Sequence, residues 1–385
     1  MGILRLTKCF ILLSALCGVC SLLSCIGAMP DTFSRIDANK LRVIGVVIGP
    51  RPEVSPGDTV TASAYFGGNE VTSINDIKVV YRYVWGINEI AYTDVDPITP
   101  LKTPVGLPDS ARISFIIKPD VFRERQPYDS IPQSTIDSIS ELFMHPKDSV
   151  AAMLSSLSDS QKTAFGDIIE KMVLPAMLMF TAHSANGTAL SAAAQFTIKY
   201  HVNLPAITPP NNNPDISWVG VCKVPDRFAF GFNYFDPSSA GNYSMTYLYN
   251  KNNPALCDSI VDVDTGYAYF LACDNGISIT DTTMDAITDK NGNRIFETYT
   301  YKWFYQNVNN LPDQDDSLMQ IDDNGSACIE MKPPGNTAMK NFRAWVACYD
   351  QINGQRMRPR GMCVRAVKGA FRFSPQYIKM KSGEN

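Results

Sequence analysis

The sequence has few of the residues, and none of the short motifs, that mark most enzymes. It contains only three histidines in 385 residues, and these are His145, His183 and His201, far apart along the chain. No HExxH, GxSxG, P-loop or Rossmann glycine pattern is present, so the common hydrolase and nucleotide-binding sites have no signature here. We therefore predict a protein that is not an enzyme, with no catalytic residue and no metal. A hydrolase whose histidine meets a serine and a carboxylate only after folding stays an alternative.

Positive charge is also in short supply. The chain has 34 lysines and arginines against 38 acidic residues, a net charge of −4. Proteins that bind nucleic acid, or that grip anionic lipid headgroups, carry the opposite balance. We expect no nucleic-acid partner.

The first residues have the pattern of an export signal. Arg5 and Lys8 precede an uncharged run over residues 9–24, which is short and poorly flanked for a membrane span. We predict a signal peptide over residues 1–24, and an uncleaved N-terminal anchor is the alternative. Removal of this segment leaves 32 basic and 38 acidic residues, a net charge of −6.

The end of this segment carries a second motif. Leu22-Leu23-Ser24-Cys25 resembles the bacterial lipobox, whose cysteine becomes the first residue of the mature protein and carries acyl chains. The resemblance implies lipidation of Cys25, a tether over residues 25–40, and anchoring in the membrane through the lipid alone, with no other cofactor. Because Ile26 rather than Asp follows Cys25, it also implies a place in the cell envelope at the outer membrane.

Composition and patterning indicate a mainly β protein. The chain has 24 glycines, 25 prolines and 17 tyrosines, which favour strands and turns. Alternating runs such as IKVVYRYVWGI and ETYTYKWFYQ place Trp85 and Trp303 on similar strands. In the second run, Tyr299, Tyr301, Trp303 and Tyr305 share one face. We interpret this stripe as core, although a sugar-stacking platform is the alternative.

Four short sequence features, which we call landmarks, recur in the same order in both halves of the chain. This recurrence indicates an internal duplication. The pairs are Val46 with Val221, Trp85 with Trp303, Lys118-Pro119 with Lys332-Pro333, and Asn186-Gly187 with Asn353-Gly354. We predict one β domain over residues 41–204, a Pro- and Asn-rich linker over 205–214, a second β domain over 215–372, and a C-terminal tail over 373–385.

Spacing between the landmarks shows where the halves differ. The first half has extra residues at about 132–175, where apolar residues recur every three or four positions, as in helices. Ser134 with Asp137 and Ser158 with Gln161 resemble capping boxes. The second half has extra residues at about 236–293, predicted to be a β-rich insert. The core size and strand pattern favour tandem immunoglobulin-like sandwiches, with another Greek-key or jelly-roll sandwich as the alternative.

The lipobox, the PEVSPGD segment and the Tyr-x-Trp strand together make the chain similar to uncharacterised bacterial lipoproteins with immunoglobulin-like or fibronectin-like domains. This resemblance implies no known activity.

Six cysteines follow Cys25, all in the second half, and an even number in an exported domain predicts disulfides. They are Cys222, Cys257, Cys273, Cys328, Cys348 and Cys363. We predict a Cys257–Cys273 bridge that closes the second insert, and leave the pairing of the other four open.

Two weaker binding hypotheses concern the second insert. Its tyrosines Tyr247, Tyr249, Tyr267 and Tyr269 are candidate ligand contacts. The acidic stretch around Asp289, Asn291 and Asn293 suggests calcium, but Arg294 stands where the EF-hand template needs glycine, and a plain turn is the preferred interpretation.

From these features we predict a lipid-anchored cell-envelope protein that acts as a binding or structural module. The two inserts are the expected contact regions, since recognition is often placed on insertions of a rigid scaffold. The alternatives are a carbohydrate-binding adhesin and, third, an envelope hydrolase. The sequence does not identify the protein or glycan partner.

Overall fold

The computed structural model describes residues 41–68, 71–81, 91–94, 99–101, 110–124, 131–204, 207, 210–230, 232, 241–274, 287–288, 294–295, 297–307, 327–331, 333, 338–352 and 361–382. Within this described part the protein is mainly β, as predicted. Its strands form four larger sheets and one two-stranded hairpin, β14 (Ile287–Thr288) with β15 (Arg294–Ile295).

Two sheets build the first half of the chain. The first has the order β1 (Arg42–Gly49), β3 (Thr59–Gly67), β7 (Ser110–Ile116), β6 (Thr99–Leu101). The second has the order β2 (Glu53–Val54), β9 (Ala189–Lys199), β8 (Val173–Ser184), β4 (Val71–Tyr81), β5 (Ala91–Asp94). β2 runs parallel to β9, and the other neighbours are antiparallel.

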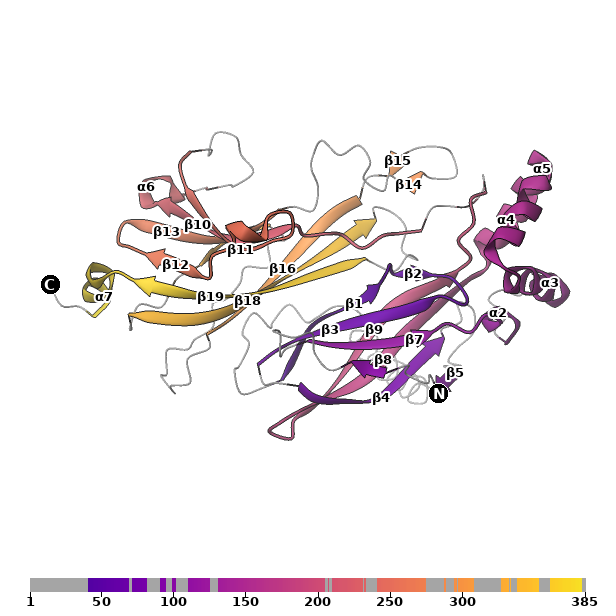
Figure 1. Cartoon of the computed structure of the whole chain (residues 1–385), viewed down its shortest axis with the longest axis horizontal. Helices are drawn as coiled ribbons and strands as arrows, with labels where there is room; N and C mark the ends of the chain where they lie inside the picture. The colour runs from indigo at the N-terminus through magenta and orange to yellow at the C-terminus, as the bar shows by residue number, and fades with distance from the viewer. Residues whose placement is uncertain are drawn as a thin grey trace, which may run out of the picture.

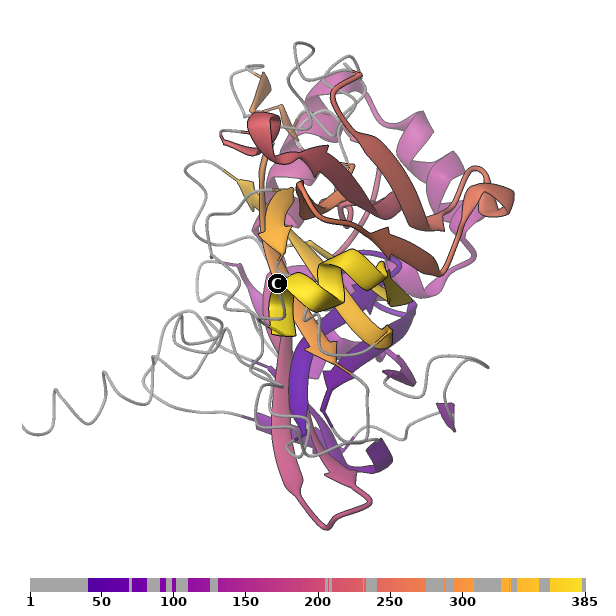
Figure 2. The same ribbon diagram turned by 90° about the vertical axis from the view of Figure 1, so that its left-hand side faces the viewer.

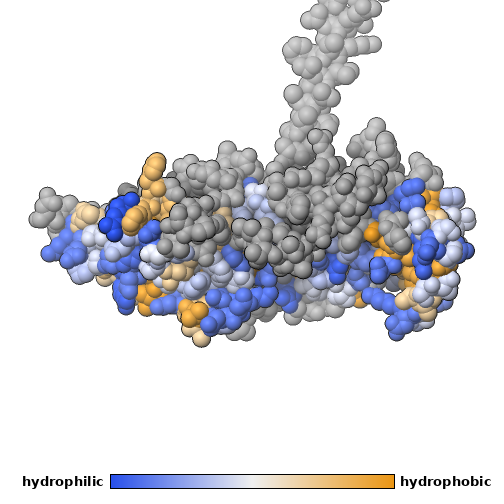
Figure 3. Space-filling view, turned by 90° about the horizontal axis from the view of Figure 1, so that it is seen from above, coloured by the Kyte–Doolittle hydropathy of each residue, from blue (hydrophilic) through white to orange (hydrophobic). Residues whose placement is uncertain are grey.

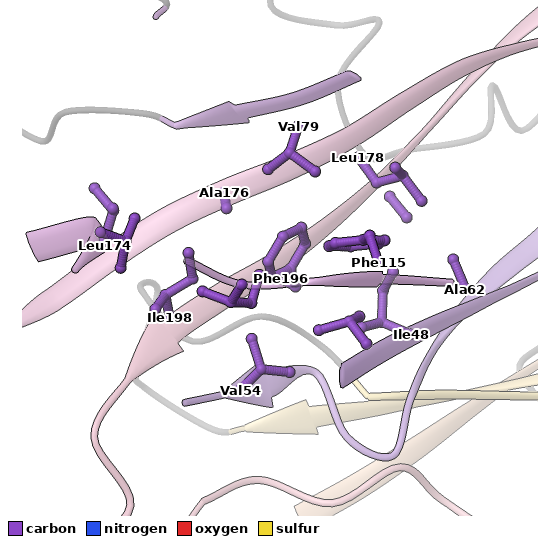
Figure 4. Close-up of a cluster of buried hydrophobic side chains, with 14 of the residues drawn as sticks. Ile48, Val54, Ala62, Val79, Phe115, Leu174, Ala176, Leu178, Phe196 and Ile198 are labelled. Carbon is purple, nitrogen blue, oxygen red and sulfur yellow. The ribbon is translucent and has the colours of Figure 1, made fainter. Parts of the chain in front are cut away.

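The two sheets enclose one apolar core. Buried and half-buried side chains alternate strictly along β8, the pattern of a strand with one face in a core. Phe115 of β7 and Phe196 of β9 meet across the core with ring centroids 5.9 Å apart. Figure 4 shows these rings among aliphatic side chains from both sheets.

Helices interrupt the first half between β7 and β8, where the helical insert was predicted. They are α2 (Val121–Glu124), α3 (Gln133–Met144), α4 (Lys147–Ser156) and α5 (Asp159–Lys171). The predicted capping box of Ser158 with Gln161 is confirmed at the start of α5. The one at Ser134 is wrong, because α3 begins earlier, after Pro132, with no side-chain cap.

The second half repeats most of this strand order, with one additional edge strand and no described counterpart of β5 or β6. One sheet runs β11 (Ser244–Asn250), β10 (Trp218–Pro225), β13 (Tyr267–Cys273), β17 (Cys328–Met331). The other runs β12 (Ile260–Val263), β19 (Met362–Phe373), β18 (Met339–Ile352), β16 (Glu297–Asn307). β12 runs parallel to β19, the last strand in chain order, just as β2 runs parallel to β9 in the first half.

The extra residues of the second half fall in two places instead of one. Residues 226–259 separate β10 from β12 and contain α6 (Asp226–Ala229), β11 and the 3₁₀ helix η2 (Pro254–Leu256). Residues 274–296 separate β13 from β16. The segment predicted as a single insert therefore includes β12 and β13, which are strands of the two main sheets.

An apolar interface joins the halves. A bulge in β1 between Val43 and Gly45 turns Ile44 out of the first core, and it packs with Trp345 of β18 and Val364 of β19. The Asn213 side chain also spans the junction: its Nδ2 donates to Ile48 O at 2.7 Å, and its Oδ1 accepts from Met362 N at 3.1 Å. The predicted linker is thus tied to both halves.

The halves lie along the long axis of the molecule, with α3–α5 at one end and α7 (Pro375–Ser382) at the other (Figure 1). Figure 2 looks along this axis with α7 in front. Residues 375–382 of the region predicted as a tail therefore form a helix, and Tyr377 of α7 is buried in the second core, where its hydroxyl donates to Pro333 O at 3.1 Å.

Candidate binding site

Two predicted sites lie outside the described residues. The lipidation candidate Cys25 precedes residue 41, and Asp289, Asn291 and Asn293 of the calcium hypothesis fall between β14 and β15. Trp85 is also outside, so its predicted equivalence to Trp303 is not tested. Among the residues that are described, no group of three His, Cys, Asp or Glu side chains could hold a metal ion.

The aromatic stripe of β16 is core, as we preferred. Tyr301, Trp303 and Tyr305 are buried, and Tyr299 packs against the same cluster. Burial raises the pKa of the Tyr301 hydroxyl. These rings present no face to a sugar.

The four tyrosines of the second insert do not form a shared exposed platform. Tyr269 is buried, and its hydroxyl accepts from Asp264 N at 2.8 Å. Tyr247 packs edge-on against Trp218, and Tyr249 lies beneath Arg365. Tyr267 is 39% exposed, but the ammonium of Lys223 covers its ring at 4.4 Å. Each ring thus contacts a different neighbour.

None of the six cysteines takes part in a disulfide in the structure, so the predicted Cys257–Cys273 bridge is not formed. Cys257 is exposed at the end of η2, whereas Cys273 is fully buried at the end of β13. The two do not share an insert, because β13 belongs to a main sheet. Cys222 and Cys328 lie on the outer face of that sheet, and Cys273, Cys348 and Cys363 line the second core.

His201, which follows β9, is largely buried. Burial, helped by the nearby charge of Arg51, lowers its pKa to about 4, and its Nε2 has no hydrogen-bond partner. The imidazole is therefore neutral at physiological pH. Ser55 and Asp58 lie beside it, but the Ser55 hydroxyl accepts from the backbone N–H of His201 at 3.0 Å and donates to Lys199 O at 3.0 Å, so it bonds to backbone groups and not to the imidazole.

The helical insert carries a shallow, open hollow. A hollow of about 360 Å³ opens between α3, α4 and α5. The lining residues are Ser138, Ile139, Glu141, Leu142, His145, Met153 and Phe165. We call this set the helical hollow.

The helices reach this arrangement because each buries only one face. On α3, Phe143 stacks on Tyr200 with ring centroids 4.1 Å apart. On α4, Val150 and Leu154 pack with Leu204, and α5 is held to β9 by the 2.8 Å ion pair of Glu170 with the buried Lys199. The opposite helix faces stay open. Met144 and Met153 are 42% and 47% exposed there.

Polar groups of the helical hollow are already engaged. The Ser138 hydroxyl donates to Ser134 O at 2.8 Å, and Glu141 forms an ion pair with Arg123. His145 lines the same hollow but is the residue that ends α3. A serine, a carboxylate and a histidine thus line one pocket, yet the serine and the carboxylate hydrogen-bond to other groups. The hollow suits an apolar side chain better than it suits acyl-transfer chemistry.

Sequence reasoning located the helices but missed the helical hollow. Period-three and period-four spacing identifies the buried face of each helix, and it does not show how three short helices are angled around a gap. The exposed methionines were a weak signal, because methionine is common on adaptable binding surfaces.

Comparison with known proteins gives no family: no family model matches the chain, and no curated protein matches it. No helix in the described residues is long and apolar enough to cross a membrane.

Proposed function

We propose that this protein is a lipid-anchored binding module of the cell envelope, tethered through Cys25 and using the helical hollow as its contact site. The anchor rests on the lipobox-like Leu22-Leu23-Ser24-Cys25. The proposal further holds that both halves are immunoglobulin-like sandwiches. The strand order supports this, because β1-β3-β7-β6 in one sheet and β4-β8-β9 in the other correspond to the ABED and CFG sheets of an immunoglobulin-like sandwich.

The observation that carries the binding role is the position of the helical hollow relative to the tether. Strand β1 begins at Arg42, opposite Gly67 at the end of β3, whereas Thr59 at the start of β3 pairs with Ile116, which leads to the helices. The tether and the helices therefore join opposite ends of the same sheet, about 25 Å apart for strands of this length. Apolar surface is visible among hydrophilic residues at the helical end in Figure 3.

The packed interface around Trp345 adds to this argument. Because the two halves bury apolar side chains against each other and share the hydrogen bonds of Asn213, they form a stiff support. An insert on a stiff support is already held in one orientation, so binding costs less conformational entropy.

The anchor is tested by replacing Cys25. In cells fed labelled palmitate, the natural chain is expected to incorporate label and to sediment with membranes, and Cys25→Ala to do neither. Cys257→Ala, which removes an exposed thiol of the body, is the control. Equal labelling of Cys25→Ala would reject the anchor.

The contact site is tested by placing a photo-crosslinking amino acid at position 153 in cells. Position 380, a methionine 57% exposed on α7, is the matched control. We expect a discrete adduct from position 153 that is lost when Ser138→Trp, at an exposed position of the lining, fills the helical hollow, and no adduct from position 380. Absence of an adduct at 153, or one that survives Ser138→Trp, would reject the site.

The adhesin alternative receives less support, because the candidate tyrosines face different neighbours. It predicts retention on polysaccharide that is lost on Tyr267→Ala.

A further inference from the structure

Strand β9 pairs on one side only along most of its length. β8 pairs with all of β9. On the other side, β2 is the only strand of the described chain, and it pairs with β9 only at Thr197 and Ile198. In Figure 2 the hairpin of β8 and β9, in pink, projects beyond the other described elements at the bottom of the view. We call the side of residues 189–195 that faces away from β8 the open side of β9.

Two hydrogen bonds at the end of β9 show which backbone groups face the open side. Thr197 N donates to Pro52 O at 2.9 Å. Lys199 O accepts from the Ser55 hydroxyl at 3.0 Å. The odd-numbered residues of β9 therefore direct their N–H and C=O groups away from β8, because these groups alternate in direction along a strand. Four residues with exposed side chains have this orientation on the open side: Ala189, Ser191, Ala193 and Gln195.

The open side also lacks the features that usually prevent strand pairing. Edge strands of natural proteins are commonly protected by charged side chains or proline. The described edge strands β5, β6, β12, β16 and β17 contain Asp94, Pro100, Asp262, Lys302 and Glu330 respectively. Residues 172–198, which include both strands of the β8–β9 hairpin, contain no lysine, arginine, aspartate or glutamate, although 19% of the whole chain is charged.

Charge favours a second copy of the chain as the partner of this side. The chain has a net charge of −4, so two copies repel each other over most of their surfaces. The open side of β9 adds no like charges to such a contact. It also matches itself: in an antiparallel pair centred on Ala192, Ser191 lies opposite Ala193 of the second copy, and Ala189 lies opposite its Gln195. Each opposed pair can exchange two backbone hydrogen bonds.

We propose that two copies of the protein associate through residues 189–195 of β9, antiparallel and centred on Ala192. The sheets that contain β9 in the two copies then join into one continuous sheet. Strands this short bury less area than the roughly 1,200–2,000 Å² of stable interfaces, so the dimer is reversible and depends on concentration. This association is separate from the binding role of the helical hollow.

The test is sedimentation velocity of the purified full chain over a series of concentrations. Ser191→Lys with Ala193→Lys places lysines directly opposite each other in the dimer, and it should raise the dissociation constant about ten-fold. Ser191→Lys with Ala193→Glu places each lysine opposite a glutamate of the second copy, and it should restore association. Ala151→Lys with Ala152→Lys, at exposed positions of α4, adds the same charge elsewhere and is the control.

Three results would overturn the proposal. The natural chain could be monomeric at every concentration, as expected if the open side binds a strand of a different protein. Association could persist unchanged in Ser191→Lys with Ala193→Lys, as expected if lipid on Cys25, which all variants keep, is the cause. Association could also be lost in both charge variants, which would reject the register. Circular dichroism confirms that each variant is folded. None of these results depends on crosslinking at position 153, so this proposal and the proposed function fail separately.

Discussion

The side chain of Met362 lies directly over the backbone of Gly45. A Cβ at Gly45 would come within 2.8 Å of the Met362 sulfur and 3.1 Å of Cγ2 of Val364. Glycine is therefore required at this point of β1 for β19 of the second half to approach. The contact makes the interface between the halves sensitive to a single added side chain.

We expect Gly45→Leu to destabilise the protein by about 2 kcal/mol, the usual cost of overpacking a close contact. Gly45→Ala should cost less, because the flexible Met362 side chain can move away from one methyl group. Chemical denaturation of both variants measures the difference. Equal stability of Gly45→Leu and the natural chain would show that the halves do not pack here.

Trp345 is the largest buried side chain of this interface, 1% exposed, and its indole N–H has no hydrogen-bond partner. Trp345→Ala should cost about 4 kcal/mol through the cavity it leaves. Trp345→Phe should cost much less, since it keeps most of the apolar contact and removes the unpaired donor. Calorimetry should show one transition for Trp345→Phe and two separated transitions for Trp345→Ala. A single unshifted transition for both would contradict the role of Trp345 in joining the halves.

The ion pair between Lys199 and Glu170 holds α5 against β9, and Lys199 is 3% exposed. Glu170→Gln should cost about 2 kcal/mol, the range for hydrogen bonds to a charged group. The control is Glu141→Gln, which removes a more exposed carboxylate of α3 and should cost less than about 1 kcal/mol. Hydrogen exchange should increase in α5 for the first variant only. Equal hydrogen exchange of α5 in the two variants would show that the Lys199–Glu170 ion pair does not hold α5 against β9.

The capping box of α5 gives a matched comparison between two serines. Ser158→Ala should cost about 1 kcal/mol because Ser158 caps the helix. Ser134→Ala, at the position where the sequence predicted a cap and the structure has none, should change stability by less than about 0.5 kcal/mol. Thermal denaturation of both variants measures the two losses of stability. A larger loss for Ser134→Ala than for Ser158→Ala would contradict the assigned helix starts.

Stability should depend on pH through His201. Burial and the charge of Arg51 lower its pKa to about 4, below the value of about 6.5 in an unfolded chain. The unfolded state therefore binds the proton first, and the contribution of the neutral imidazole is complete above pH 6.5 and is lost as the pH falls toward 4. Between pH 7.5 and pH 5 the loss should be about 2 kcal/mol.

The neighbouring charges test this assignment. Lys199 and Lys147 lower the pKa of His201 further, and Asp58 opposes them. His201→Gln should flatten the pH dependence between pH 7.5 and pH 5, whereas His145→Gln, at an exposed position, should leave it unchanged. An unchanged slope in His201→Gln would assign the acid sensitivity to other groups.

Much of the second half could be predicted from local patterns, and the errors have one physical source. Alternation along β16 correctly placed Tyr301 and Trp303 in a core, because a strand with one apolar face must bury it. The same reasoning could not separate Cys257 from Cys273. Cys257 follows the 3₁₀ helix η2, and only sheet pairing shows that β13, which ends at Cys273, belongs to a main sheet while Cys257 lies in the segment between β10 and β12.

The sequence by itself determined the mainly β architecture and the presence of helices within residues 132–175, since these follow from side-chain periodicity, which is local. Tertiary structure alone decided which surfaces meet. The bulge that turns Ile44 toward Trp345, the helical hollow between three short helices, and the open side of β9 depend on strand register and interhelical angles. Strand register and interhelical angles are set by packing between residues far apart in the chain. A local sequence pattern does not show which distant residue will be the contact partner.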